Sequence, residues 1–291
     1  MNLRDLQYIV TVADTGNFGK AAEICNVSQS TLSIQIKKLE EYLGVQLFER
    51  SNKKVMLTAI GKDICERTRH ILHQAEEIRQ LAKSERDPFC GELTLGAFPT
   101  LAPYLFPLCS GSIKKNFPKL LMKLVEEKTA SLLELLESGR LDCALIAGPV
   151  ERQGIKSVEL FHERFFLAVP KNNPLSKKKK ITDEELAGIQ LLLLDEGHCL
   201  RSQALEICHS IGSGESIKFR ATSLETLRQM VAMGDAITLI PELAVRHDNP
   251  NICYIPLQNK SFGRKICLCW RETSAKEALF QKLAEVISAA N

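Results

Sequence analysis

The sequence lacks any run of about 18 consecutive apolar residues, the length that a membrane-spanning helix requires. Its first ten residues, MNLRDLQYIV, also lack the unbroken apolar stretch of a signal peptide, because Arg4 and Asp5 interrupt it. These two absences argue against helical membrane spans and predict a cytoplasmic protein that has no membrane partner.

A large excess of charge of one sign is also absent. The chain has 38 Lys and Arg against 35 Asp and Glu, so its formal net charge is only +3. This is too small to argue for nucleic-acid binding, and any such prediction must rest on where particular side chains lie. Apolar residues, in contrast, make up 45% of the 291 residues, which is enough for two or more folded units.

Residues 1–58 have the pattern of a compact helical unit that ends in a hairpin. Apolar spacing predicts a helix from Leu3 to Ala13, a short helix near residues 20–25, and a third that Ser28 caps and Gly44 ends. Two helices joined by a short turn form the helix-turn-helix pattern. The segment LFERSNKKVMLT then resembles a hairpin with a basic tip, which suits a wing that holds the DNA backbone.

The third predicted helix has a polar outward face that suits DNA. Leu32, Ile36 and Leu39 mark its buried side, and hydroxyl groups near its N-terminus suit phosphates and base edges. A solvated basic turn is the alternative for the hairpin tip, but the preceding helix-turn-helix favours DNA binding. The predicted DNA-binding residues are Ser28, Gln29, Ser30, Thr31, Ser33, Gln35, Lys37, Arg50, Lys53 and Lys54.

Residues 59–87 continue as one long helical pattern. Apolar residues from Ile64 to Ala82 alternate at spacings of four and three, which gives a heptad-like seam. A helix of about 30 residues is about 45 Å long, too long to pack only on the N-terminal unit. The seam therefore predicts pairing with a second copy of the chain, and Pro88 ends the helix.

From residue 88 onward, short apolar runs alternate with helical segments, which predicts a parallel α/β sheet. The predicted strands of a first part include GELTLGAFPT, LLMKLVE and LDCALIAG. Those of a second part, which the run FHERFFLAV opens, include KFRATS and AITLIP. The second part also contains HCLRSQALEICH, residues 198–209, with a cysteine and a histidine at each end.

Ten cysteines occur in a chain that we expect in a reducing compartment, where a disulfide is more often regulatory than structural. Cys199 directly precedes a predicted helix from Leu200 to Ile211, and Cys208 lies within it. Nine positions at 100° each turn their side chains to opposite faces, and a continuous helix separates them by about 13 Å. A disulfide requires Cα atoms about 4.4 to 6.8 Å apart, so the helix would have to break.

Seven of the other eight cysteines are interpreted as small buried hydrophobes. This interpretation applies to Cys25, Cys65, Cys109, Cys143, Cys253, Cys267 and Cys269. A zinc site made of His198, Cys199, Cys208 and His209 stays open as an alternative, although the helical geometry turns the two pairs apart. We therefore predict no metal site and no cofactor.

The stretch FGKAAEICNVSQSTLSIQIKKLEEYLGVQLFER, with LTAIGK after it, resembles the winged helix-turn-helix of the LysR-type transcriptional regulators. The resemblance covers the whole chain, and GHCL, Cys208 and FRATSLETLRQMVA are similar to the peroxide-sensing branch of that family. It implies a winged helix-turn-helix domain at 1–58, a linker helix at 59–87 and a regulatory domain at 88–291. The regulatory domain would be built like a periplasmic binding protein, with α/β subdomain I at about 88–162 and 269–291 and subdomain II at about 163–268.

The resemblance also implies a function. The protein would be a peroxide-sensing regulator of oxidative-stress genes in which Cys199 becomes a sulfenic acid and then forms a disulfide with Cys208. This step would alter a homotetramer, a dimer of dimers, on promoter DNA and its contact with RNA polymerase. Thr100, Thr129, His198 and Arg264 fall at positions that support the peroxide site. Lys218 departs from the pattern, in which a histidine precedes FRATS.

The chemistry of Cys199 needs activation, because only a thiolate attacks peroxide well and an ordinary cysteine has a pKa of about 8.5. The N-terminus of the following helix, together with His198 and Arg201 as neighbouring cations or hydrogen-bond donors, supplies it. We predict a sensor and not an enzyme. The alternatives are a LysR-type regulator that binds a small metabolite between the subdomains, and a thiol peroxidase-like enzyme.

Overall fold

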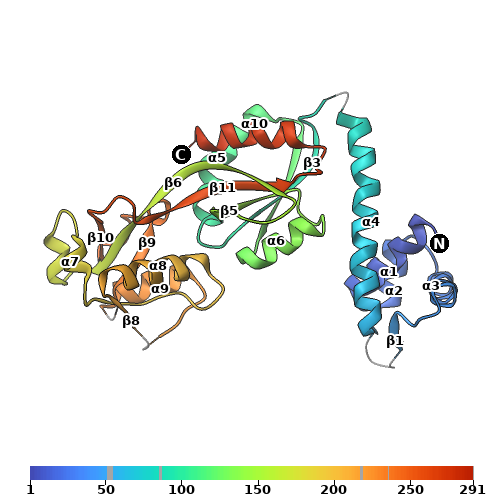
Figure 1. The fold of residues 1–291 in the computed structure, drawn as a ribbon, viewed down its shortest axis with the longest axis horizontal. Helices are drawn as coiled ribbons and strands as arrows, with labels where there is room; N and C mark the ends of the chain where they lie inside the picture. The colour runs from blue at the N-terminus through green and yellow to red at the C-terminus, as the bar shows by residue number, and fades with distance from the viewer. Residues whose placement is uncertain (51–54, 85–86, 217–218, 235, 291) are drawn as a thin grey trace. The chain divides into compact units, whose positions relative to one another are not determined.

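The computed structural model describes residues 1–50, 55–84, 87–216, 219–234 and 236–290. The chain divides into two compact units, one of Met1–Arg86 with Ser138–Arg140 and the other of Asp87–Glu137 with Leu141–Asn291, and each is described by itself (Figure 1). Within the described residues, no helix is long and apolar enough to cross a membrane.

The N-terminal unit contains three short helices, a hairpin and a long helix. Their bounds are α1 Leu3–Thr15, α2 Phe18–Ile24, α3 Gln29–Leu43, β1 Phe48–Arg50, β2 Val55–Leu57 and α4 Ala59–Ser84. The Ser28 hydroxyl accepts from the backbone N–H of Thr31 and caps α3, and Gly44 ends that helix in the left-handed conformation. Strands β1 and β2 pair antiparallel. The predicted helix-turn-helix and hairpin are both confirmed.

Glu40 fixes the start of the hairpin against α3, a contact that sequence patterns did not reveal. This glutamate is only 9% exposed. Its carboxylate accepts hydrogen bonds from the backbone N–H groups of Leu47, at 2.8 Å, and Phe48, at 3.2 Å. A buried carboxylate thus satisfies two backbone donors and sets the direction in which the hairpin leaves the helix.

The long helix α4 has 26 residues and is about 39 Å long at 1.5 Å per residue. Of its predicted apolar seam, Ile71 is 45% exposed and Ile78 is 68% exposed. These two side chains stand free of the N-terminal unit's own core. Pairing of this helix with a second copy stays a prediction.

One seven-stranded sheet runs through the second unit in the order β10-β6-β11-β5-β3-β4, with β9 paired to β6. The strands are β3 Gly91–Ala97, β4 Leu120–Glu126, β5 Cys143–Gly148, β6 Ile155–Pro170, β9 Thr238–Pro241, β10 Ile252–Pro256 and β11 Gly263–Arg271. Strands β3, β4 and β5 are parallel, as predicted. The pairs β10–β6, β11–β5, β11–β6 and β6–β9 are antiparallel, so the prediction of a parallel sheet was wrong for these pairs.

Helices cover the sheet around two hydrophobic cores. The first core is packed by α5 Ala102–Asn116, α6 Thr129–Glu137 and α10 Glu277–Ser288, and the second by α7 Asp183–Leu186, α8 Cys199–Ile211 and α9 Leu224–Ala232. The 16-residue strand β6 joins them, because Ile155 lies in the first core and Phe165 in the second (Figure 1). Short segments complete the second half: β7 Gln190–Leu191, β8 Gly214–Glu215, η1 Pro174–Lys177 and η2 Glu242–Ala244.

The predicted strand KFRATS is a correction. Within its described residues, 219–223, only Ala221 pairs, in a single bridge with Leu194. The segment has the β-branched and aromatic residues of a strand, but it leads directly to Ser223, the N-cap residue of α9. The start of that helix leaves no room for a longer ladder.

Candidate functional site

Helix α8 carries both candidate redox cysteines on opposite sides. It runs without interruption from Cys199 to Ile211, and both thiols are free. Cys199 is half-buried and packs against the first core, whereas Cys208 is 1% exposed and belongs to the second core. The prediction that the two thiols point apart is confirmed. Because an unbroken helix separates their Cα atoms by about 13 Å, a disulfide requires α8 to unwind.

Cys199 is the first residue of α8, so it lies at the positive end of the helix dipole. The preceding residue, His198, is the N-cap, but its side chain makes no capping hydrogen bond. Its ring is 6% exposed, and within the described part of the chain its Nε2 atom has no hydrogen-bond partner. Burial lowers the pKa of His198, the charge of Lys128 lowers it further, and Asp195 opposes them. His198 was predicted to act on Cys199 as a cation or as a hydrogen-bond donor. Its lowered pKa favours the neutral donor.

Acidification below about pH 6.5 is expected to destabilise the reduced protein through His198. The folded-state pKa lies below the unfolded value, so the unfolded chain binds the proton more tightly. The free energy of unfolding therefore falls as the pH decreases from about 6.5 toward the folded pKa. Urea unfolding, followed by the fluorescence of the single tryptophan, Trp270, should show a smaller decrease in His198→Gln. Equal decreases in both proteins would place the effect on another group.

Thr100 and Thr129, the two predicted hydroxyl groups, have different surroundings. The Arg264 guanidinium donates to Thr100 Oγ1 at 2.8 Å and to the Thr100 carbonyl at 2.9 Å. Thr129 begins α6, and its buried Oγ1 has no hydrogen-bond partner among the described residues. Thr100 Oγ1 thus already accepts one hydrogen bond and still has its proton to donate. Within the part of the chain that the structure describes, Thr129 Oγ1 is free both to accept and to donate a hydrogen bond.

Arg264 is held by a buried glutamate that the sequence analysis missed. Its Nε donates to Glu163 Oε2 at 2.7 Å, and the two side chains are 0% and 2% exposed. Glu163 Oε1 accepts from the backbone N–H of Leu243 at 3.0 Å. The guanidinium also lies over the Phe98 ring, 4.8 Å from its centre. Glu163 is the single acidic residue within the largely apolar run FHERFFLAV, and this was the signal that could have indicated it.

Arg201 does not have the predicted role of a donor to Cys199. Its Nη1 and Nη2 atoms donate to Glu215 at 2.6 and 2.8 Å, and Nη1 also donates to the Leu194 carbonyl at 3.1 Å. These hydrogen bonds from Arg201 lower the pKa of Glu215. The pair ties the first turn of α8 to β8. Lys218, the other predicted supporting cation, lies outside the described residues.

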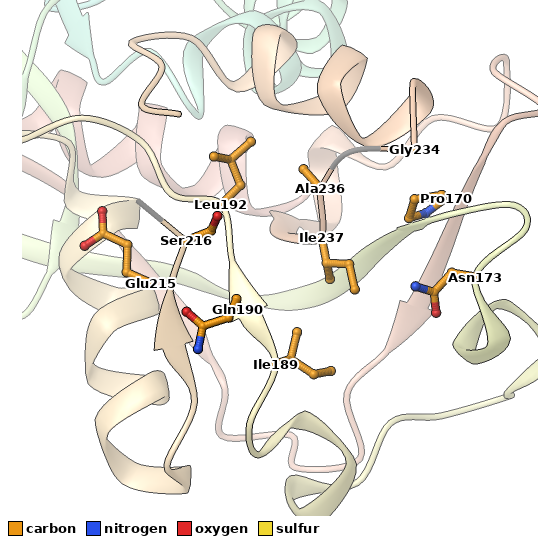
Figure 2. Close-up of a pocket in the computed structure, with 10 residues that line it drawn as sticks. All are labelled: Pro170, Asn173, Ile189, Gln190, Leu192, Glu215, Ser216, Gly234, Ala236 and Ile237. Carbon is orange, nitrogen blue, oxygen red and sulfur yellow. The ribbon is translucent and has the colours of Figure 1, made fainter. Parts of the chain in front are cut away.

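A cavity of about 530 Å³ is lined in part by residues of β7 and β8 (Figure 2). Apolar and polar side chains both line it, and the lining residues are Pro170, Asn173, Ile189, Gln190, Leu192, Glu215, Ser216, Gly234, Ala236 and Ile237. All of them belong to the half of the unit that holds the second core. The cavity is therefore not the cleft between subdomains that the metabolite alternative requires.

The predicted DNA-binding residues that the structure describes lie at the N-terminus of α3, along the first nine residues of that helix, and at the end of β1. Gln29, Ser30 and Thr31 are exposed, and the Ser28 hydroxyl lies 2.9 Å from that of Ser30 and 2.7 Å from that of Thr31. Ser33 and Gln35 are half-buried. Lys37 is exposed beside Glu41, and Arg50 ends β1. Lys53 and Lys54 lie outside the described residues.

For the zinc alternative, the described residues contain no group of three His, Cys, Asp or Glu side chains placed to hold a metal ion. His198 and Cys199 are at one end of α8, and Cys208 and His209 are in its last turn. One unbroken helix cannot bring the two pairs to a common metal ion.

Comparison with known proteins identifies the family. Residues 3–62 match the description "Bacterial regulatory helix-turn-helix protein, lysR family", and residues 86–291 match "LysR substrate binding domain". The chain belongs to the LysR-type transcriptional regulators. This is a family of regulators and not of enzymes, which removes the peroxidase-like alternative.

Within the LysR-type family, the chain is similar to peroxide-responsive members. It is 41% identical over 289 residues to a "Hydrogen peroxide-inducible genes activator" of Pectobacterium carotovorum, covering 99% of this chain and 96% of that protein. It is 41% identical over 291 residues to the "DNA-binding transcriptional dual regulator OxyR" of Escherichia coli, covering 99% and 95%. The solved structure of a full-length OxyR variant from Pseudomonas aeruginosa matches with a TM-score of 0.81, 38% identity and coverage of 99% and 94%.

Proposed function

We propose that this protein is a hydrogen-peroxide-responsive transcriptional activator, with Cys199 as the sensing thiol and Cys208 as its disulfide partner. The observation that carries the proposal is α8, an unbroken helix with a half-buried thiol at its N-terminus and a second thiol in a different core. The 41% identity to peroxide-inducible gene activators over 99% of the chain supports peroxide as the signal.

The proposed reaction has two steps. The Cys199 thiolate attacks one oxygen of hydrogen peroxide, an S–O bond forms as the O–O bond breaks, and the released hydroxide takes up a proton to become water. The Cys208 thiolate then attacks the sulfur of the Cys199 sulfenic acid, an S–S bond forms, and the hydroxyl group leaves as water after protonation. The two thiols together supply the two electrons that reduce the peroxide.

The second step makes the protein a switch. Burial raises the pKa of Cys208, so this thiol stays protonated and enclosed while α8 is intact. Formation of the disulfide requires Cys208 to leave the second core and the helix between the cysteines to unwind. The regulatory domain would then repack, and subunit arrangement on the DNA would change with it.

The output would be made by the N-terminal unit. The N-terminus of α3 and the hairpin would contact promoter DNA, and α4 would join two copies through its exposed Ile71 and Ile78. We extend this to a dimer of dimers that contacts RNA polymerase in the cytoplasm. Domains at 1–58, 59–87 and 88–291, the last with two α/β subdomains, would divide these tasks.

Mapping of thiols tests this proposal directly. Reduced protein is treated with a short pulse of peroxide and digested without reductant, and both forms are footprinted on the promoter beside the protein's own gene. We expect a peptide with a Cys199–Cys208 bond only after peroxide, together with a changed footprint. Peroxide-treated protein with both thiols free, or with its bond between other cysteines, would refute the proposal. So would a footprint identical in both forms.

A further inference from the structure

Lys128 joins the first half of the regulatory unit to the loop that precedes Cys199. Its backbone carbonyl accepts from the N–H of Leu132 at 2.9 Å, which places it at the start of α6. Its side chain reaches the loop before α8, where Nζ donates to the backbone carbonyl of Glu196 at 2.8 Å. The contact spans 68 positions of sequence and ends three residues before Cys199.

The Lys128 side chain also lies directly against Gly197. This glycine has φ of +84°, in the region that other residues rarely adopt. A Cβ atom at this position would lie 3.1 Å from Lys128 Cδ and 3.2 Å from Nζ. The backbone next to His198 and Cys199 is therefore packed as well as hydrogen-bonded by the lysine.

Other contacts on this loop come from the second half of the unit. The N–H of Asp195 donates to the Ala221 carbonyl at 2.8 Å, and Arg201 donates to the Leu194 carbonyl at 3.1 Å. Lys128 adds a contact from the first half of the unit, at the residues that lead into α8. Its ammonium group is close enough to His198 to act on that ring, where Asp195 provides the opposing charge.

We propose that Lys128 is a positioning residue that holds residues 196–198, and with them the N-terminus of α8, in the reduced arrangement. This inference rests on the proposed function. Because Cys199 must leave its place before it can meet Cys208, release of the Glu196 carbonyl from Lys128 is part of disulfide closure. The lysine thereby sets how long the Cys199 sulfenic acid persists before the disulfide forms.

Two substitutions at one position test the role of the ammonium group. Lys128→Met keeps an unbranched chain over Gly197 but removes the donor, whereas Lys128→Arg keeps a cation and N–H donors. Lys123→Met, an exposed lysine on β4, is the matched control for loss of one charge. Amide hydrogen exchange of residues 195–200 is measured in each reduced protein, and rapid-quench mass mapping separates formation of the sulfenic acid from formation of the disulfide.

We expect Lys128→Met to exchange faster at residues 195–200 and to close the disulfide about 5- to 10-fold faster, the effect of one lost hydrogen bond. Lys128→Arg and Lys123→Met should both resemble the unsubstituted protein. Unchanged exchange and unchanged closure in Lys128→Met would overturn the proposal. It would also be overturned if only the first step, or its pH profile, changed, because Lys128 would then act on peroxide chemistry alone.

The two proposals can fail separately. Exchange in the reduced protein requires no disulfide, so it measures the hold of Lys128 on the loop even if Cys199 and Cys208 never join. Absence of the Cys199–Cys208 bond in the unsubstituted protein would defeat the proposed function. Faster exchange in Lys128→Met, found alongside that absence, would still establish the positioning contact but remove its link to redox closure.

Discussion

Replacement of Cys199 by serine is expected to abolish the response of promoter binding to peroxide and to leave the reduced fold intact. A serine hydroxyl has nearly the size of the thiol but does not ionise near neutral pH, so it cannot attack peroxide. The position is half-buried at a helix N-terminus, where serine is well tolerated. We expect peroxide to be consumed at least about 100-fold more slowly, at the rate of the remaining thiols.

The measurement is stopped-flow consumption of peroxide together with footprinting before and after treatment. Cys253→Ser, at another half-buried cysteine, on β10, is the matched control and should respond like the unsubstituted protein. If Cys199→Ser still changed its footprint with peroxide, the sensing thiol would have to be sought elsewhere.

Four of the remaining thiols, all in the first core, give part of the physical reason for this selectivity. Burial raises the pKa of Cys109, Cys143 and Cys267, and it raises the pKa of Cys269 to about 12. A thiol with a raised pKa holds less thiolate at neutral pH and reacts more slowly with peroxide. These groups lie in the first core, which supports their interpretation as small buried hydrophobes.

Local sequence patterns were sufficient to predict the features that depend on a single helix. The 100° rotation per residue was enough to turn Cys199 and Cys208 apart on α8, and cap chemistry was enough to begin α3 at Ser28 and end it at Gly44. These features depend on neighbours a few positions away. They do not depend on how distant segments meet.

The contacts that hold the site in place depend on long-range packing. Lys128 and Glu196 are 68 positions apart, and Glu163 and Arg264 are 101 positions apart. No periodicity links such pairs, because only the pairing of β11 with β6 brings Arg264 opposite Glu163. For the same reason Arg201 was predicted to act on Cys199, which is close in sequence, whereas in the fold it donates to Glu215.

The buried ion pair of Glu163 and Arg264 leads to the largest expected effect on stability. Glu163→Gln leaves the Arg264 charge buried without a carboxylate, and loss of one partner of such a pair costs about 3 to 5 kcal/mol of the free energy of unfolding. The neutral amide can accept only one of the two hydrogen bonds that Glu163 accepts, so a lost acceptor adds to the uncompensated charge. Urea unfolding followed by Trp270 fluorescence reports it, since Trp270 lies in the first core.

Two comparisons isolate that charge. Glu242→Gln removes the carboxylate of the neighbouring but exposed pair with Arg164, and it should cost less than about 1 kcal/mol. The double variant Glu163→Gln/Arg264→Met removes both charges, so it should be more stable than Glu163→Gln alone. A double variant less stable than the single one would contradict this account. Arg264 would then stabilise the fold chiefly through Thr100 and Phe98, and Glu163 would only orient its guanidinium.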